Sequence, residues 1–162
     1  MNFSTLFRLR ENLNLDRKTL VILRWIAIAG QFSAINLVYF YLKLDFPVVI
    51  AHGVLFLGFL SNLYLQFVIK SNALKDLYAG SFLIYDLIQL TALLYLTGGI
   101  SNPFSILMII PTIVSSTFLS MGTTIVLGIL TIISLFVITI FHYPLPGIHD
   151  HSMTFPKLYL TG

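Results

Sequence analysis

Five long apolar segments, separated by short polar connections, constrain this chain more than any other feature of its sequence. They cover residues 24–42, 46–69, 77–96, 103–119 and 123–143. Each is close to the ~20 residues that an α-helix needs to cross a hydrocarbon core about 30 Å thick. Lipid offers no partners to backbone amides, so these segments are predicted to be helices. The expected fold class is all-α: a polytopic membrane helical bundle of five transmembrane helices plus the start of a sixth.

Composition places the chain in a membrane. Of its 162 residues, 57% are hydrophobic and 9% are charged, and the mean hydropathy is +0.94. A soluble domain has roughly 25% charged residues, so this chain has too little polar surface to face water. Cysteine is absent, which excludes disulfides and thiolate metal sites within this segment.

The basic residues predict the orientation. Seven Lys and Arg residues fall on the side of the N-terminus, and only Lys43 and Lys157 fall on the other side. This bias predicts a cytoplasmic N-terminus. We therefore expect a cytoplasmic tail at 1–22, a five-helix transmembrane domain at 23–143, and an outer loop with the start of a truncated sixth helix at 144–162.

Polar side chains inside the expected spans are few. Asp86 is the only acidic residue well inside one, and a charge there costs at least ~2.5–3.5 kcal/mol, so it should face the bundle and find a partner. With Gln89 and Thr97 it forms a stripe that is either a polar track for a ligand or proton, or a set of helix-packing contacts. Arg24 is interpreted as an interfacial anchor, and Gln31, on the same helix face, as a packing residue.

The fourth segment carries a proline and a stripe of small residues. Pro111 removes one amide and predicts a kink. Thr112, Ser116 and Ser120 recur every four residues, a spacing typical of a close helix-packing seam. A kink that opens a lateral slot for a lipid-like molecule is the alternative.

The loop between the third and fourth segments holds the candidate site. Gly98 and Gly99 adopt positive φ readily, Pro103 suits the first turn of the next helix, and Asn102 suits its N-cap. A plain turn explains this pattern. The alternative is a pocket in which Asn102 offers a donor and an acceptor to a quinone ring and Phe104 flanks it.

Three blocks of sequence resemble a known family. They are residues 19–31, residues 86–90, and Gly98-Gly99 followed by Asn102-Pro103-Phe104. They resemble the sensor domain of the RegB/PrrB/ActS redox-responsive histidine kinases, multi-pass proteins of the bacterial inner membrane. The resemblance implies that the loop motif senses ubiquinone. It makes Gly98, Gly99, Asn102, Pro103 and Phe104 the candidate quinone-binding residues, with Asp86 and Gln89 as a supporting polar track.

The resemblance also implies what lies outside these residues. The phosphoacceptor histidine and the ATP-binding domain would follow residue 162, and the partners would be a second copy of the chain and a response regulator. Within the chain we expect no catalytic residue, no metal site and no nucleic-acid surface. The expected function is the membrane sensor portion of a two-component histidine kinase that follows the quinone pool. The alternatives are a small membrane transporter and a quinone-linked membrane enzyme.

Overall fold

The computed structural model describes residues 15–41, 43 and 45–143 and confirms the predicted helical membrane bundle. The α-helices are α2 (Arg17–Asn36), α3 (Val48–Phe67), α4 (Asp76–Leu96), α5 (Ile110–Phe118) and α6 (Met121–Ile140). A π-helical stretch, η1 (Leu37–Tyr41), extends α2, and two 3₁₀ helices, η2 (Gly99–Ser101) and η3 (Pro103–Ile109), lie between α4 and α5. The expected sixth helix lies outside the described residues.

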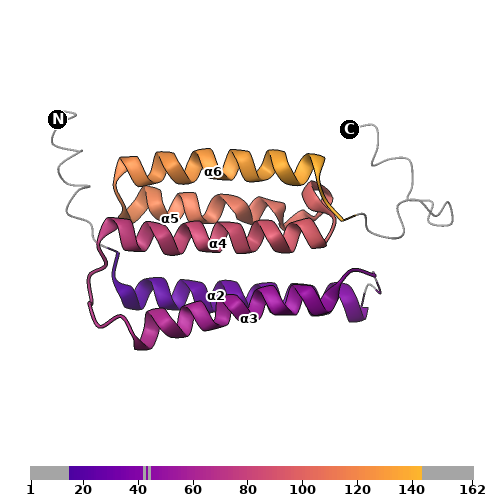
Figure 1. The fold of residues 1–162 in the computed structure, drawn as a ribbon, viewed down its shortest axis with the longest axis horizontal. Coiled ribbons are helices and arrows are strands. Elements are labelled where there is room, and N and C mark those ends of the chain that lie inside the picture. The colour runs from indigo at the N-terminus through magenta and orange to yellow at the C-terminus, as the bar shows by residue number, and fades with distance from the viewer. Residues whose placement is uncertain (1–14, 42, 44, 144–162) are drawn as a thin grey trace.

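The helices form two layers, α2 with α3 and α4 with α5 and α6 (Figure 1). Helix α2 packs on α3, and α6 packs on both α4 and α5. Contacts between α3 and α4 join the two layers. Short connections make consecutive long helices antiparallel, so α2 begins at the end of the bundle opposite to the one where α6 finishes (Figure 1).

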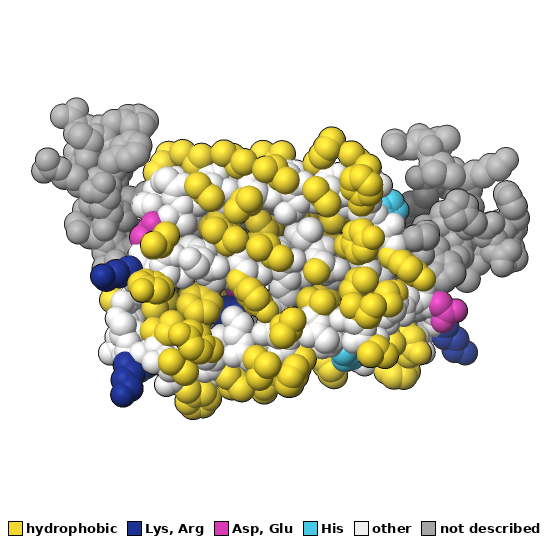
Figure 2. All heavy atoms as spheres, in the orientation of Figure 1, with side chains coloured by type: hydrophobic (Ala, Val, Ile, Leu, Met, Phe, Trp, Pro, Cys, Tyr) yellow, Lys and Arg dark blue, Asp and Glu magenta, His cyan; other side chains and the backbone are white. Residues whose placement is uncertain are grey.

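The flank of the bundle is apolar. Hydrophobic side chains cover it, and charged side chains gather at its two ends (Figure 2). Val49 is 81% exposed, and Ile132 and Phe136 of α6 are 68% and 66% exposed. In water such a surface would drive aggregation. Facing lipid, it is the surface that a membrane bundle requires.

The expected fourth span is shorter than its neighbours. Helices α2 with η1, α3, α4 and α6 are long and apolar enough to cross a membrane, whereas Pro103–Phe118 is a shorter apolar helix. Its first seven residues are 3₁₀, with a rise of about 2.0 Å per residue instead of the 1.5 Å of an α-helix. The stretched geometry brings this segment to about 27 Å, close to the ~30 Å of a hydrocarbon core.

Helix α2 begins at Arg17, earlier than its apolar segment predicts. The Arg17 amide donates to the Asn72 carbonyl at 2.9 Å, and the Leu74 amide donates to the Leu15 carbonyl at 3.3 Å. Leu15 and Leu20 are fully buried. The first turns of α2 are therefore held against the α3–α4 connection. The predicted division at residues 22 and 23 stays a prediction.

The small-residue stripe of the fourth segment is displaced from its predicted register. Thr112 lies 3.0 Å from the Thr131 hydroxyl of α6, as a packing residue should. The next contact to α6 comes from Ser115, which is buried and 3.1 Å from Thr124. Ser116 is exposed and bonds its own helix. Thr112 and Ser115 both lie in α5 (Ile110–Phe118), where residues three apart share a face as readily as residues four apart, and the face toward α6 takes the spacing of three.

A carboxylate joins the start of α4 to the start of α6. Asp76 accepts hydrogen bonds from the Ser120 amide at 2.6 Å, from the Ser120 hydroxyl at 2.8 Å and from the Thr123 hydroxyl. Ser120 itself caps α6 by accepting from the Thr123 amide. Acidic groups are favoured at helix N-termini because the backbone N–H groups there lack partners.

Replacing Asp76 by Ala is expected to destabilise the bundle by about 1–3 kcal/mol, since it leaves the donors at the start of α6 without their acceptor. Thermal unfolding of the variant in detergent, followed by circular dichroism, measures the effect. Asp45→Ala is the matched control, because Asp45 is exposed. Equal unfolding temperatures for the two variants would contradict the role assigned to Asp76.

Candidate functional site

The Gly-Gly loop needs both of its glycines. Gly98 and Gly99 have φ values of 99° and 62°, in the left-handed region that residues with a Cβ rarely adopt. A Cβ on Gly99 would also lie 2.6 Å from the Ile138 carbonyl oxygen and 2.6 Å from the His142 Cβ. The loop is therefore pressed against the end of α6, and these two glycines serve the turn.

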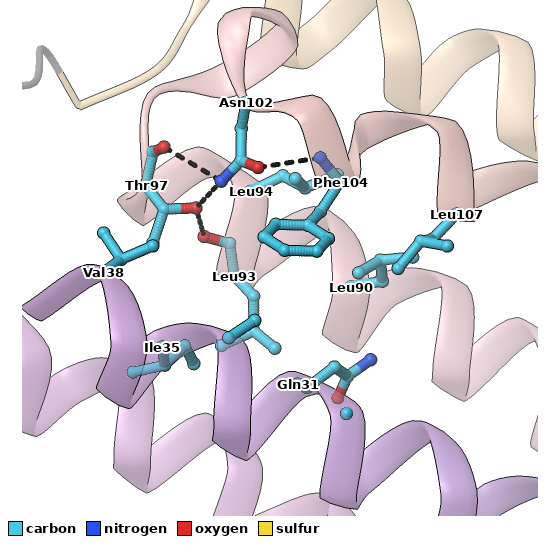
Figure 3. A pocket seen from close by; sticks show the side chains of 12 residues that line it. Gln31, Ile35, Val38, Leu90, Leu93, Leu94, Thr97, Asn102, Phe104 and Leu107 are labelled. Carbon is cyan, nitrogen blue, oxygen red and sulfur yellow. Dashed lines mark hydrogen bonds between the residues drawn. The ribbon is translucent and has the colours of Figure 1, made fainter. Parts of the chain in front are cut away.

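Asn102 holds the loop closed. Its Oδ1 accepts from the Phe104 amide at 2.9 Å, as predicted for an N-cap with Pro103 in the first turn. Its Nδ2 donates to the Thr97 hydroxyl at 2.8 Å and to the Thr97 carbonyl at 3.1 Å. Figure 3 shows these bonds. Both halves of the amide, which the pocket alternative directed toward a ligand, are engaged within the loop.

A cavity of about 130 Å³ lies between α2, α4 and the start of η3. An apolar cavity of about 150 Å³ is large enough to bind benzene, so this one is the size of a single ring. Thr97, Asn102 and Phe104 line the cavity on the loop side and Gln31 lines it from α2 (Figure 3). The rest of its wall is Gly30, Ala34, Ile35, Val38, Leu90, Leu93, Leu94 and Leu107.

The structure separates the candidate quinone residues into two groups. Asn102 and Phe104 line the cavity, whereas Gly98, Gly99 and Pro103 are not part of its wall. A role for any of the five in quinone binding stays a prediction.

Asp86 has the partner that its position demands. Nε of Arg24 donates to its two carboxylate oxygens at 2.9 Å and 3.1 Å, and Nη2 lies 2.8 Å from Oδ1. Nη2 also donates to the Ser61 hydroxyl of α3 at 3.1 Å. The Arg24 residue is only 3% exposed, and its guanidinium lies over the Phe82 ring. The interpretation of Arg24 as an interfacial anchor is wrong, because the paired carboxylate holds it inside the bundle.

Gln89, like Asp86, connects α4 to α2. Its Nε2 donates to Oε1 of Gln31 at 2.9 Å, which confirms that the Gln31 face of α2 meets protein. Gly58 of α3 leaves room for this side chain, since a Cβ there would lie 2.7 Å from its Cδ. The expected track thus divides: Asp86 and Gln89 bridge two helices, and Thr97 faces the cavity.

A second cavity, of about 270 Å³, adjoins the first one. It lies between α2, α4 and α5, beside the Arg24–Asp86 pair. The two cavities share four lining residues: Gly30, Gln31, Leu90 and Leu107. A ring in the first cavity therefore has an apolar space next to it that suits a hydrocarbon substituent.

The α2 wall of the site was missed at the level of sequence. Gly30 and Gln31 line both cavities. The sequence signal that could have indicated this wall was the amide of Gln31 beside Gly30 in the middle of an apolar span. Among residues 15–41, 43 and 45–143, no group of three or more His, Asp or Glu side chains is placed to hold a metal ion. His149 and His151 lie outside that part of the chain.

Two comparisons with known proteins match almost the whole chain. The model of the PilS-like transmembrane domain matches residues 8–159. The sensor histidine kinase RegB of Cereibacter sphaeroides is 35% identical over 146 residues, which are 90% of this chain and 32% of that protein. The chain thus spans about a third of the length of this relative. No solved structure matches the chain.

Removing either partner of the Arg24–Asp86 pair is expected to cost about 3–5 kcal/mol, because the other charge stays buried alone. The single variants Arg24→Leu and Asp86→Leu should therefore both be strongly destabilised, and the double variant should be more stable than either one. Thermal unfolding in detergent tests this order. Additive losses in the double variant would count against a direct interaction.

Gly99→Ala is expected to destabilise the protein by about 1–3 kcal/mol, because an alanine is strained in a left-handed backbone conformation and its methyl group would clash with the end of α6. Gly122→Ala is the control, since a Cβ there meets nothing closer than 3.9 Å. The unfolding temperatures of both variants measure the difference. An unchanged temperature for Gly99→Ala would contradict this description of the loop.

Proposed function

The chain belongs to the family of PilS-like transmembrane domains, and we propose that it is the membrane sensor portion of a two-component histidine kinase that follows the redox state of the quinone pool. The kinase part of the proposal is supported by the likeness to RegB, which is named a sensor histidine kinase. Since the chain spans about a third of that relative, binding of ATP and phosphotransfer to a response regulator are assigned to segments other than these 162 residues.

The ring-sized cavity supports the choice of ligand. Its wall is almost entirely aliphatic and aromatic, with the Gln31 amide on one side and the Thr97–Asn102 loop on the other. Ligand pockets are commonly apolar, with a few polar groups that fix orientation. A quinone fits this description: a flat ring, polar oxygens at opposite positions, and a hydrocarbon tail for the adjoining cavity. Ubiquinone is the candidate.

The position of the cavity suits a sensor. It lies between α2 of one layer and α4 and η3 of the other, so a ligand there contacts both layers. A ligand changes a conformational equilibrium only by its difference in affinity for the two states. A tenfold change needs about 1.4 kcal/mol, and one hydrogen bond, worth about 0.5–1.5 kcal/mol, is sufficient in scale.

The multi-pass membrane location follows from the fold and the family. We assign it to the bacterial inner membrane, with the N-terminus in the cytoplasm as the basic residues predict. A homodimer is the proposed signalling unit. Under this proposal the candidate quinone residues act in two ways: Asn102 and Phe104 form the wall of the site, and Gly98, Gly99 and Pro103 shape the turn that presents it.

Filling the cavity tests the proposal. Gly30 lines both cavities and a Cβ there meets nothing within 4 Å, so Gly30→Leu adds a bulky side chain at the cavity wall without a clash at its Cβ. Binding of a short-chain ubiquinone to the 162-residue chain in lipid nanodiscs is expected to weaken at least about tenfold, which corresponds to 1.4 kcal/mol.

The matched control is Gly53→Leu. A Cβ on Gly53 also meets nothing within 4 Å, but this residue lines a separate groove between α2 and α3. Binding to this variant should equal that of the parent chain. Absence of saturable ubiquinone binding to the parent chain, or equal binding to both glycine variants, would contradict the proposed site.

A further inference from the structure

We propose that the side-chain amides of Gln31 and Gln89, which are hydrogen-bonded to each other, distinguish an oxidised quinone ring from a reduced one. They do so by flipping together, so that the oxygen and nitrogen of each amide exchange places. This inference rests on the proposed function, since it requires a quinone in the cavity. It assigns redox discrimination to α2 and α4, whereas the sequence pointed to Asn102.

The side-chain amide of Asn102 already makes three hydrogen bonds within the loop. Its two donor bonds go to Thr97, and its oxygen accepts from the Phe104 amide. Using its NH₂ group for a ring carbonyl would break a bond that closes the loop, and breaking it offsets the bond formed. An oxidised ring therefore gains little from Asn102, whose oxygen keeps one lone pair for a hydroxyl.

Gln31 presents the free donor of the cavity. Its Oε1 accepts from Gln89, and its Nε2 has no hydrogen-bond partner in the part of the chain that the structure describes. The residue lines the cavity, and Figure 3 shows its amide nitrogen pointing from α2 toward Leu90. In this arrangement the cavity offers an N–H to a carbonyl oxygen, the acceptor that an oxidised quinone carries.

The pair has a second arrangement of the same shape. The oxygen and nitrogen of an amide are nearly equal in size, so turning both amides over leaves the packing unchanged. Nε2 of Gln31 then donates to Oε1 of Gln89, and Oε1 of Gln31 faces the cavity. The cavity now offers an acceptor, which suits the hydroxyl of a reduced ring.

The two arrangements are closely balanced. At present Oε1 of Gln89 is buried with no hydrogen-bond partner among the described residues, on the side of Gly58. After the turn, Nε2 of Gln89 takes that place. Each state leaves one polar group of Gln89 unsatisfied, so neither is strongly favoured by the protein. The hydrogen bond to the ring then decides between them.

Two substitutions test the pair by different routes. Gln31→Met keeps the length of the side chain and removes its hydrogen bonds, so binding of both ubiquinone and ubiquinol should weaken about three- to tenfold. Gln89→Glu introduces a carboxylate, which only accepts hydrogen bonds when ionised. It therefore accepts from Nε2 of Gln31, and Oε1 of Gln31 is left facing the cavity. This variant should favour ubiquinol over ubiquinone about three- to tenfold more than the parent chain does.

Gln66→Met is the matched control, because Gln66 bonds Trp25 and does not line the cavity. Both ligand forms are titrated against the 162-residue chain in nanodiscs, and circular dichroism verifies the helical content of each variant. Binding of both forms with parent affinities and ratio in Gln31→Met and Gln89→Glu would overturn this inference and leave the quinone site standing. Failure of the parent chain to bind either form would overturn the proposed function as well.

Discussion

The ion pair between Arg24 and Asp86 is the interaction on which the rest of the structure depends. It joins α2 to α4 across a bundle whose layers meet mainly through α3 and α4. Two charges in a hydrocarbon environment are tolerated only because they meet each other. That meeting fixes the rotation of both helices. With the rotation fixed, Gln31 and Gln89 also face each other, and the space on the loop side of them becomes the cavity.

The sequence was sufficient for everything that hydrophobicity and local backbone chemistry decide. The third apolar segment, 77–96, coincides with α4 to within one residue. The positive φ of Gly98 and Gly99 and the N-cap at Asn102 follow from the residue types alone. These features depend on neighbours along the chain, so no knowledge of tertiary packing was needed to predict them.

The features that were missed depend on which helix faces which. Arg24 lies 62 residues from Asp86, and a basic residue near a span end is equally compatible with a lipid interface. The α2 wall of the cavity could not be predicted, because the sequence gives no rotation of α2 relative to α4. The occupied amide of Asn102 shows the same limit: the residue type predicts the cap, but the engagement of its other half by Thr97 depends on how the loop closes.

The 3₁₀ geometry of η3 has a consequence for the shape of the wall. With three residues per turn, side chains three apart stand directly above one another, whereas on an α-helix they drift around the axis. Phe104 and Leu107 therefore form a straight row along the first cavity, and Ile110 continues it into the second. On another side Ile106 and Ile109 form a parallel row in the groove beside α6. The segment therefore presents one straight row of side chains to the two cavities and another to the groove beside α6.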